Sequence, residues 1–105
     1  MKKTLTTNGN TWQLYLTKTI SQFLGLTPQE YTVQFKITNK TLYVEKYTSK
    51  QKEDGLLLRK LIKRSAGFGL NFPISVLELL EINPEEDLVD INIEGNKLII
   101  KKAEN

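Results

Sequence analysis

The fold of this chain is decided by residues 68–102, which read FGLNFPISVLELLEINPEEDLVDINIEGNKLIIKK. Apolar residues alternate with small or polar ones over 68–72, which is typical of a half-buried strand. Pro73 has no backbone N–H and a fixed φ, so it ends this strand and suits the first turn of a helix. We predict that helix over Ile74–Glu81, because its apolar residues recur at helical spacing and Asn83-Pro84 then breaks the pattern.

The rest of the stretch predicts a β-hairpin. Leu88–Ile93 alternates between apolar and polar residues, and Lys97–Lys102 forms the second arm. Glu94-Gly95-Asn96 supplies the tight turn between them. The order is therefore strand, short helix, strand, strand.

The same passage occurs twice. A shift of 56 positions sets Gly9–Lys46 beside Ser65–Lys102 without a gap, and eight of the 38 aligned pairs are identical. Eight further pairs are apolar in both copies. Chance similarity does not keep apolar positions in phase in this way, so the chain contains a duplicated structural unit.

The first copy predicts the same elements. Thr17 or Thr19 can cap a short helix that ends at Leu24-Gly25. Two hairpin arms follow at Val33–Ile37 and Leu42–Lys46.

One more strand is predicted ahead of each copy, over Lys3–Thr7 and Leu57–Arg64. We place the first repeat at residues 1–47, a polar linker at 48–56 and the second repeat at 57–105. One repeat alone would expose sheet edges and an apolar face, so the two are expected to share one core. The expected fold class is mainly β with two short helices.

Composition excludes several functions. Among the 105 residues there is no cysteine and no histidine, which removes disulfides, thiolate metal sites and the commonest general base. No nucleophile–base pair, carboxylate dyad or glycine-rich phosphate loop can be assembled, so we predict neither an enzyme nor a bound cofactor or metal. Neither a signal peptide nor a membrane-spanning stretch is recognisable, which predicts a cytoplasmic protein.

Charge is distributed unevenly along the chain. The net charge is +6 over residues 1–52, +2 over 53–64 and −5 over 65–105. A polyanion would therefore prefer residues 1–52 and the segment 53–64 over residues 65–105. Glu85, Glu86 and Asp87 form an acidic run that lacks the spacing of a calcium loop, and we interpret it as a solvated turn.

The densest basic cluster lies on the predicted strand over 57–64. Long cationic side chains on one exposed face suit phosphate contacts, but charges on an edge strand also protect it against aggregation. Lys18 lies at a helix start, and the Asn10-Thr11 loop could reach base edges or merely shape the turn. The candidate DNA-binding residues are Asn10, Thr11, Lys18, Arg59, Lys60, Lys63 and Arg64.

The second copy resembles the AbrB/MazE/SpoVT swapped-hairpin family over residues 69–84 and 88–102. In the first copy, Gly9-Asn10-Thr11 resembles the Gly-Asn-Ser loop of MazE-type members, and Leu24-Gly25-Leu26 matches the helix end of the family. The resemblance implies that two units interleave their hairpins into a swapped-hairpin AbrB-like barrel. Tandem copies imply a pseudo-dimer within one chain.

The resemblance also implies binding to double-stranded DNA, by a transcriptional regulator or an antitoxin-like protein. The chain departs from the family where paired helix arginines fall on Ser21-Gln22 and Leu77-Glu78. The arginine that begins the second strand falls on Gln13 and Gly69. A second hypothesis is therefore a protein-interaction or inhibitor module, whose acidic second repeat engages a toxin or a target enzyme.

Overall fold

The computed structural model describes residues 1–8, 11–48 and 57–104. Two short helices and ten strands follow one another along this part of the chain. Their bounds are β1 Lys2–Lys3, β2 Thr6–Asn8, β3 Thr11–Thr17, α1 Lys18–Phe23, β4 Thr32–Thr38, β5 Thr41–Lys46, β6 Leu57–Lys60, β7 Ile62–Arg64, β8 Gly67–Phe72, α2 Ile74–Leu79, β9 Val89–Glu94 and β10 Lys97–Lys102.

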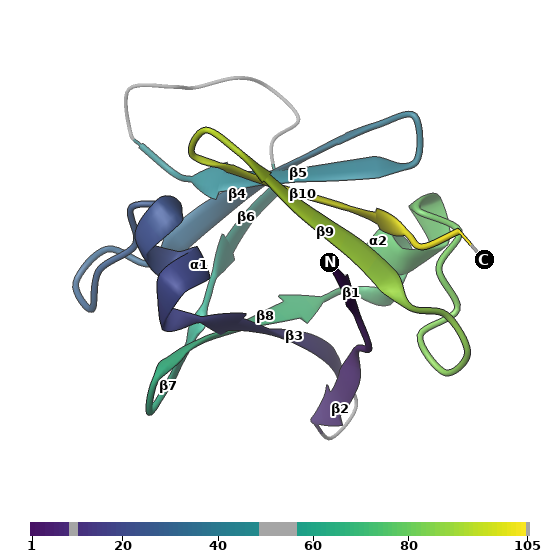
Figure 1. Ribbon diagram of the computed structural model, residues 1–105, viewed down its shortest axis with the longest axis horizontal. Coiled ribbons are helices and arrows are strands. Elements are labelled where there is room, and N and C mark those ends of the chain that lie inside the picture. The colour runs from purple at the N-terminus through teal and green to yellow at the C-terminus, as the bar shows by residue number, and fades with distance from the viewer. Residues whose placement is uncertain (9–10, 49–56, 105) are drawn as a thin grey trace.

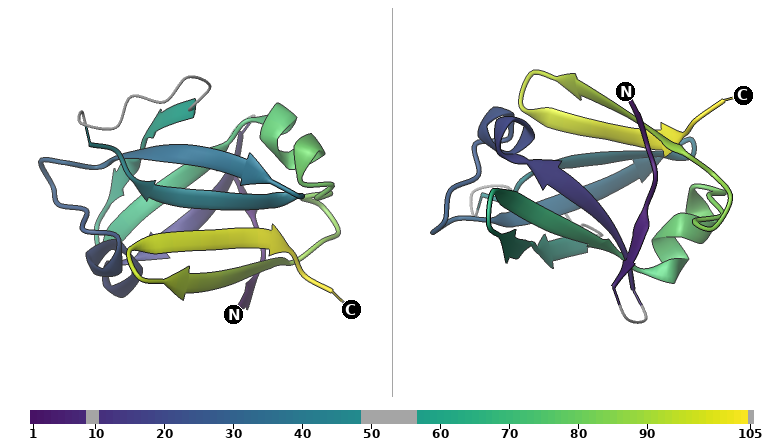
Figure 2. Two further views of the ribbon diagram at one scale, coloured as in Figure 1. Left: turned by 90° about the horizontal axis from the view of Figure 1, so that it is seen from above. Right: turned by 60° about the horizontal axis from the view of Figure 1, so that its bottom comes forward.

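The strands form two antiparallel sheets. The large sheet has the order β1-β9-β10-β5-β4-β6, and the small sheet has the order β2-β3-β8-β7. Figure 1 shows β3 and β8 beneath the two hairpins, with α1 and α2 at opposite ends of the molecule. The hairpins β4–β5 and β9–β10 lie side by side in the view from above (Figure 2, left). The prediction of a mainly β protein with two short helices is confirmed.

The strand pairing has an internal two-fold symmetry. Leu14 lies opposite Leu70 in the small sheet, and Tyr43 lies opposite Ile99 in the large sheet. Each of these pairs joins one position of the first copy to the same position of the second, 56 residues further on. A local two-fold axis therefore passes through both pairs and relates the two copies.

The same symmetry exchanges the outer strands. β1 pairs with β9, with Lys3 opposite Val89, and β6 pairs with β4, with Arg59 opposite Val33. The strand ahead of each copy thus adds to the hairpin of the other copy. Figure 2 (right) shows β1 crossing from the small sheet toward β9.

The described strands do not form a closed barrel, so the swapped-hairpin barrel expected from the sequence is not confirmed. The strands predicted over Lys3–Thr7 and Leu57–Arg64 each divide in two, and each half pairs in a different sheet. The breaks fall at Leu5 and Leu61, whose side chains are buried in the core. The chain bends there because the leucine points between the sheets, and the Leu61 N–H donates to the Tyr31 carbonyl at 3.0 Å. Among the described strands no ladder joins the two sheets.

Both copies contribute to one hydrophobic core. The central leucines of the hairpins, Leu42 and Leu98, are fully buried, as are Leu14 and Leu70 on the two-fold axis. Ile37 and Ile93 pack against this core from its rim. Since the contributions interlock across the symmetry axis, neither copy can keep its apolar residues from water alone.

The two helices end in the same hydrogen-bond pattern with different residues. Gly25 and Leu26 donate their N–H groups to the carbonyls of Gln22 and Ser21, both at 3.0 Å. Gly25 has a φ of +76°, which is the left-handed conformation of a Schellman motif. In the second copy the left-handed position is held by Glu81, with a φ of +56°. A side chain at that position is strained, because its Cβ approaches the following carbonyl.

Candidate nucleic-acid interface

The basic segment divides between two strands. Lys63 lies opposite Phe68 and Arg64 lies opposite Gly67 on edge strand β7. Neighbouring side chains on a strand point to opposite faces, and Phe68 is buried. Lys63 therefore reaches around the core side of the sheet edge, and Arg64 lies on the outer face of the small sheet.

Two of the lysines, Lys60 and Lys63, lie against the ring of Tyr31. Its ring stacks on that of Phe68, with centroids 5.6 Å apart and an interplanar angle of 26°. The Nζ atoms of Lys60 and Lys63 lie 5.3 Å and 5.0 Å from the Tyr31 centroid. Attraction between each ammonium and the ring holds these two cations side by side at the end of the sheet.

A chain of hydrogen bonds positions Arg64. Its Nη2 donates to Gln13 Oε1, and Gln13 Nε2 donates to Asn71 Oδ1 at 2.8 Å. Gln13 is only 3% exposed although its strand face is the outer one. Gly69 leaves room for the Gln13 side chain to lie against the sheet, because a Cβ at position 69 would lie 2.6 Å from Gln13 Cδ. The guanidinium is therefore fixed on one side and keeps further N–H groups for a ligand.

Lys18, Lys63 and Arg64 meet around a groove. Its cavity volume is about 460 Å³. Besides these three cations, it is lined by Ser21, Gln22, Leu26, Pro28, Ser65, Ala66, Gly67 and Phe68. We call this cavity, together with Lys60 beside it, the basic groove.

Lys18 is the first residue of α1, and the start of this helix places it beside the groove. Thr17 is the N-cap, and of the two threonines that the sequence offers it is this one that caps the helix. Thr17 Oγ1 accepts a hydrogen bond from the Ile20 N–H at 3.3 Å, and Ser21 Oγ donates to the Thr17 carbonyl at 2.9 Å. The cap fixes the first turn of α1, while the Lys18 side chain remains exposed.

The other candidate residues lie elsewhere. Arg59 is half-buried and faces the core side of its strand, opposite Val33. Thr11 lies at the end of β3 remote from Lys18, a separation of about 20 Å for a strand of this length. Asn10 lies outside the described residues. The structure thus brings Lys18, Lys60, Lys63 and Arg64 together, and it separates Thr11 from them.

The cations of the basic groove lack acidic partners within the part of the chain that the structure describes. Among the described residues, no carboxylate lies within 4.0 Å of Lys18, Lys60, Lys63 or Arg64. Other cations are paired, such as Lys40 with Glu81 at 2.8 Å and Lys102 with Asp87 at 3.6 Å. The groove therefore carries uncompensated positive charge.

The symmetry-related place on the other side of the two-fold axis has a different chemistry. Ile74 stands for Lys18, Glu78 for Gln22, Asp87 for Tyr31 and Thr7 for Lys63. The internal two-fold symmetry therefore holds for the backbone and the core, and it fails at the surface around the groove.

The acidic run of the second copy forms a hydrogen-bonded turn. Asp87 Oδ2 accepts from the Asn83 N–H at 2.8 Å, and the Glu85 N–H donates to Asn83 Oδ1 at 3.1 Å. Within the part of the chain that the structure describes, no group of three or more acidic, histidine or cysteine residues is arranged to hold a metal ion. Glu81, nearby, has a pKa below its ordinary value, because the Lys40 ammonium donates a hydrogen bond to its carboxylate and adds its positive charge.

Sequence reasoning misses three residues of this site: Tyr31, Gln13 and Asn71. Their roles depend on contacts between distant segments, which local patterns do not show. Comparison of the two copies is an available signal, since Tyr31 aligns with Asp87 and Gln13 with Gly69. The two copies share a core, so positions at which their residues differ indicate where their surfaces differ.

Comparison of the chain with protein-family models, curated proteins and solved structures finds no match. In the described residues, neither helix has the length and apolar character needed to cross a membrane.

Proposed function

We propose that this protein binds duplex DNA through the basic groove, as a small transcriptional regulator or antitoxin-like protein of the AbrB/MazE type. The observation that carries the proposal is the convergence of Lys18, Lys60, Lys63 and Arg64, none of which has an acidic partner among residues 1–8, 11–48 and 57–104. These cations come from three elements, α1, β6 and β7, and are placed together by the fold. Phosphate contacts supply most of the affinity of such interfaces.

The strand pairing supports the fold that this function implies. In a swapped-hairpin arrangement, two units exchange strands around a two-fold axis. The pairing of β1 with β9 and of β6 with β4 supports such an exchange between the two copies of this chain. We therefore propose an intrachain pseudo-dimer of the swapped-hairpin type.

Arg64 is proposed as the residue that contacts the DNA most closely. It lies on the outer face of the small sheet, and its hydrogen bond to Gln13 fixes the guanidinium in place. A planar guanidinium forms paired hydrogen bonds with phosphate oxygens or with the edge of guanine. Lys18, Lys60 and Lys63 then serve as phosphate contacts that orient the duplex.

The second candidate is a protein interface on the acidic half. Ile74 and Leu79 of α2 are 53% and 61% exposed, and Leu88 is 41% exposed. Glu78, Glu85 and Glu86 are also exposed in this part of the chain. Exposed apolar side chains and carboxylates favour a basic protein partner, such as a toxin or a target enzyme.

Salt dependence of DNA binding tests the proposal. The logarithm of affinity falls with the logarithm of salt concentration by about 0.9 per phosphate contact. Replacement of Lys63 and Arg64 by alanine should therefore weaken binding at low salt and reduce the slope by about 1.8, measured by fluorescence anisotropy with a labelled duplex.

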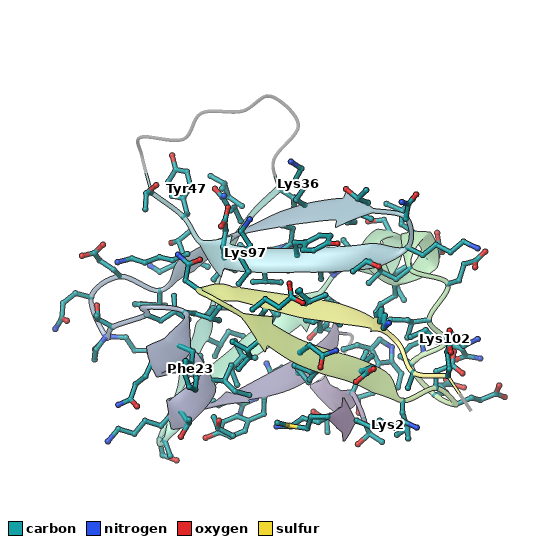
Figure 3. The ribbon with its side chains drawn as sticks, turned by 45° about the horizontal axis from the view of Figure 1, so that its top comes forward. Lys2, Phe23, Lys36, Tyr47, Lys97 and Lys102 are labelled. Carbon is teal, nitrogen blue, oxygen red and sulfur yellow. The ribbon has the colours of Figure 1, made fainter. Side chains whose placement is uncertain are left out.

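The matched control replaces Lys36 and Lys97 by alanine. Both lysines are exposed on strands of the large sheet (Figure 3), and neither lines the groove. This variant loses the same charge and should keep the slope of the unmodified protein. Equal flattening in both variants would show that the protein binds DNA through its overall charge, and absence of binding at low salt would refute the proposal.

A further inference from the structure

The basic groove has the dimensions of a small-molecule site. Its volume of about 460 Å³ lies within the range of about 300–1,000 Å³ that is usual for ligand pockets. It is walled by α1 and the loop after it on one side and by the β7–β8 turn on the other. A duplex laid across its mouth would contact the cations at the rim without filling the hollow.

The charges around the basic groove favour the binding of an anion. Lys18 approaches from α1, while Lys63 and Arg64 approach from β7. Like charges that converge on a cavity repel one another, and a bound anion relieves this repulsion. Arg64 is already oriented by Gln13, so it can present two parallel N–H groups to a phosphate at little entropic cost.

The apolar lining of the basic groove favours a ligand larger than a simple ion. Carbon surface is contributed by Leu26, Pro28, Ala66 and Phe68. The Phe68 ring is stacked on Tyr31, which fixes its orientation. A flat ring attached to the anion would cover this surface and gain the free energy of apolar burial.

We propose that the basic groove binds a small phosphomonoester attached to a ring system, the class of the nucleoside monophosphates. The phosphate lies among Lys18, Lys63 and Arg64, and the ring lies over the apolar floor. Since these cations are also the proposed DNA contacts, ligand and DNA exclude each other, and this second step rests on the proposed function. The groove would then make DNA binding responsive to a small metabolite.

Comparison with the second copy suggests a variant that tests ligand binding in the groove. Glu78 occupies the position of Gln22, so the change Gln22→Glu introduces the acidic residue that the other half already carries. Gln22 is exposed and lines the groove, so this change alters its charge and leaves the core intact. Asn92→Asp is the matched control, because it makes the same amide-to-acid change on an exposed residue of β9 that does not line the groove.

The first experiment titrates the full chain with AMP and follows backbone amide chemical shifts. Saturable shifts are expected at Gln22, Ser65 and Phe68. Adenosine and inorganic phosphate should each bind at least about tenfold more weakly, which corresponds to about 1.4 kcal/mol. Gln22→Glu should weaken AMP binding about fivefold or more, while Asn92→Asp stays within about twofold. Ala66→Trp, which fills the cavity without a change of charge, should abolish the shifts.

Three results would overturn the ligand assignment: AMP shifts that do not saturate, equal affinity for AMP and adenosine, or phosphate binding as tight as AMP binding. The second experiment adds AMP to the complex of the protein with duplex DNA, and release of the duplex is expected. If AMP binds and the duplex stays bound, the competition step is wrong. If AMP binds and DNA does not bind at all, the proposed function fails while the ligand site stands.

Discussion

Replacement of Glu81 by glycine should stabilise this protein. Glu81 holds the left-handed position at the end of α2 with a φ of +56°, and its N–H bonds to the Glu78 carbonyl at 3.0 Å. The left-handed conformation costs about 1–2 kcal/mol for an L-residue with a Cβ. Glycine avoids this strain but gives back about 0.5–1 kcal/mol as extra freedom in the unfolded chain. The midpoints of these two ranges leave an expected net gain of about 0.75 kcal/mol.

Two further variants separate backbone strain from the ion pair with Lys40. Glu81→Ala removes the carboxylate and keeps the Cβ, so its stability should stay near that of the unmodified protein, because an exposed pair contributes little. Gly25→Ala is the mirror experiment in the first copy and should destabilise by about 1 kcal/mol. A Cβ there would meet only Lys46 Cδ, at 3.9 Å, so the loss would reflect φ and not a clash.

Thermal and urea unfolding followed by circular dichroism measure these differences. Glu81→Gly should raise the midpoint temperature by about 2–8 °C, given the usual dependence for small domains. The reasoning is refuted if Glu81→Gly and Glu81→Ala have the same stability, or if Gly25→Ala is neutral. Either result would mean that the strain at the left-handed residues does not exceed the freedom that glycine adds to the unfolded chain.

The core, the surface charge and the asymmetry of the two halves each lead to one more prediction. Leu98→Ala should cost about 2–5 kcal/mol in urea unfolding, because Leu98 is 0% exposed; a loss below about 1 kcal/mol, on the order of an exposed site, would contradict a shared core. Lys40→Ala should return the lowered pKa of Glu81 toward its ordinary value in an NMR titration of the carboxyl signal, and an unchanged pKa would show that the Lys40 hydrogen bond is not its cause. Since that folded-state pKa lies below the unfolded one, the pair contributes stability above the unfolded pKa and loses it as the pH falls through the folded pKa. DNA should be bound as well at a single half-site as at a palindrome, because the cations gather on only one side of the two-fold axis; a clear preference for the palindrome in competition titrations would show that both sides read DNA.

Local patterns in the sequence are sufficient for the individual elements. The prediction of a helix over Ile74–Glu81 agrees with α2 at Ile74–Leu79, and the predicted arms Val33–Ile37 and Leu42–Lys46 fall within β4 and β5. Both depend on residue periodicity and on turn residues, which act within a few positions. The duplication also aligns the two copies at an offset of 56 residues, and the observed strand register pairs residues at this offset, such as Leu14 with Leu70.

Long-range features cannot be predicted in this way. The split of residues 57–64 at Leu61 depends on which sheet each half meets, and alternation along one strand carries no such information. The gathering of Lys60 and Lys63 on Tyr31 joins segments about thirty positions apart in sequence. The predicted helix extends through Glu81, although the alignment of this residue with Gly25 indicates the left-handed end.

The most direct test of a DNA interface confined to one half is a backbone amide titration of the intact protein with a duplex oligonucleotide. The two-fold symmetry makes the molecule its own control, because Lys18 and Lys63 have symmetry-related counterparts 56 residues away, Ile74 and Thr7. We expect shifts that saturate at Lys18, Lys63 and Arg64 and that are absent at Ile74 and Thr7. Equal shifts at both sets of positions, or shifts centred on α2 and the acidic turn, would contradict the account.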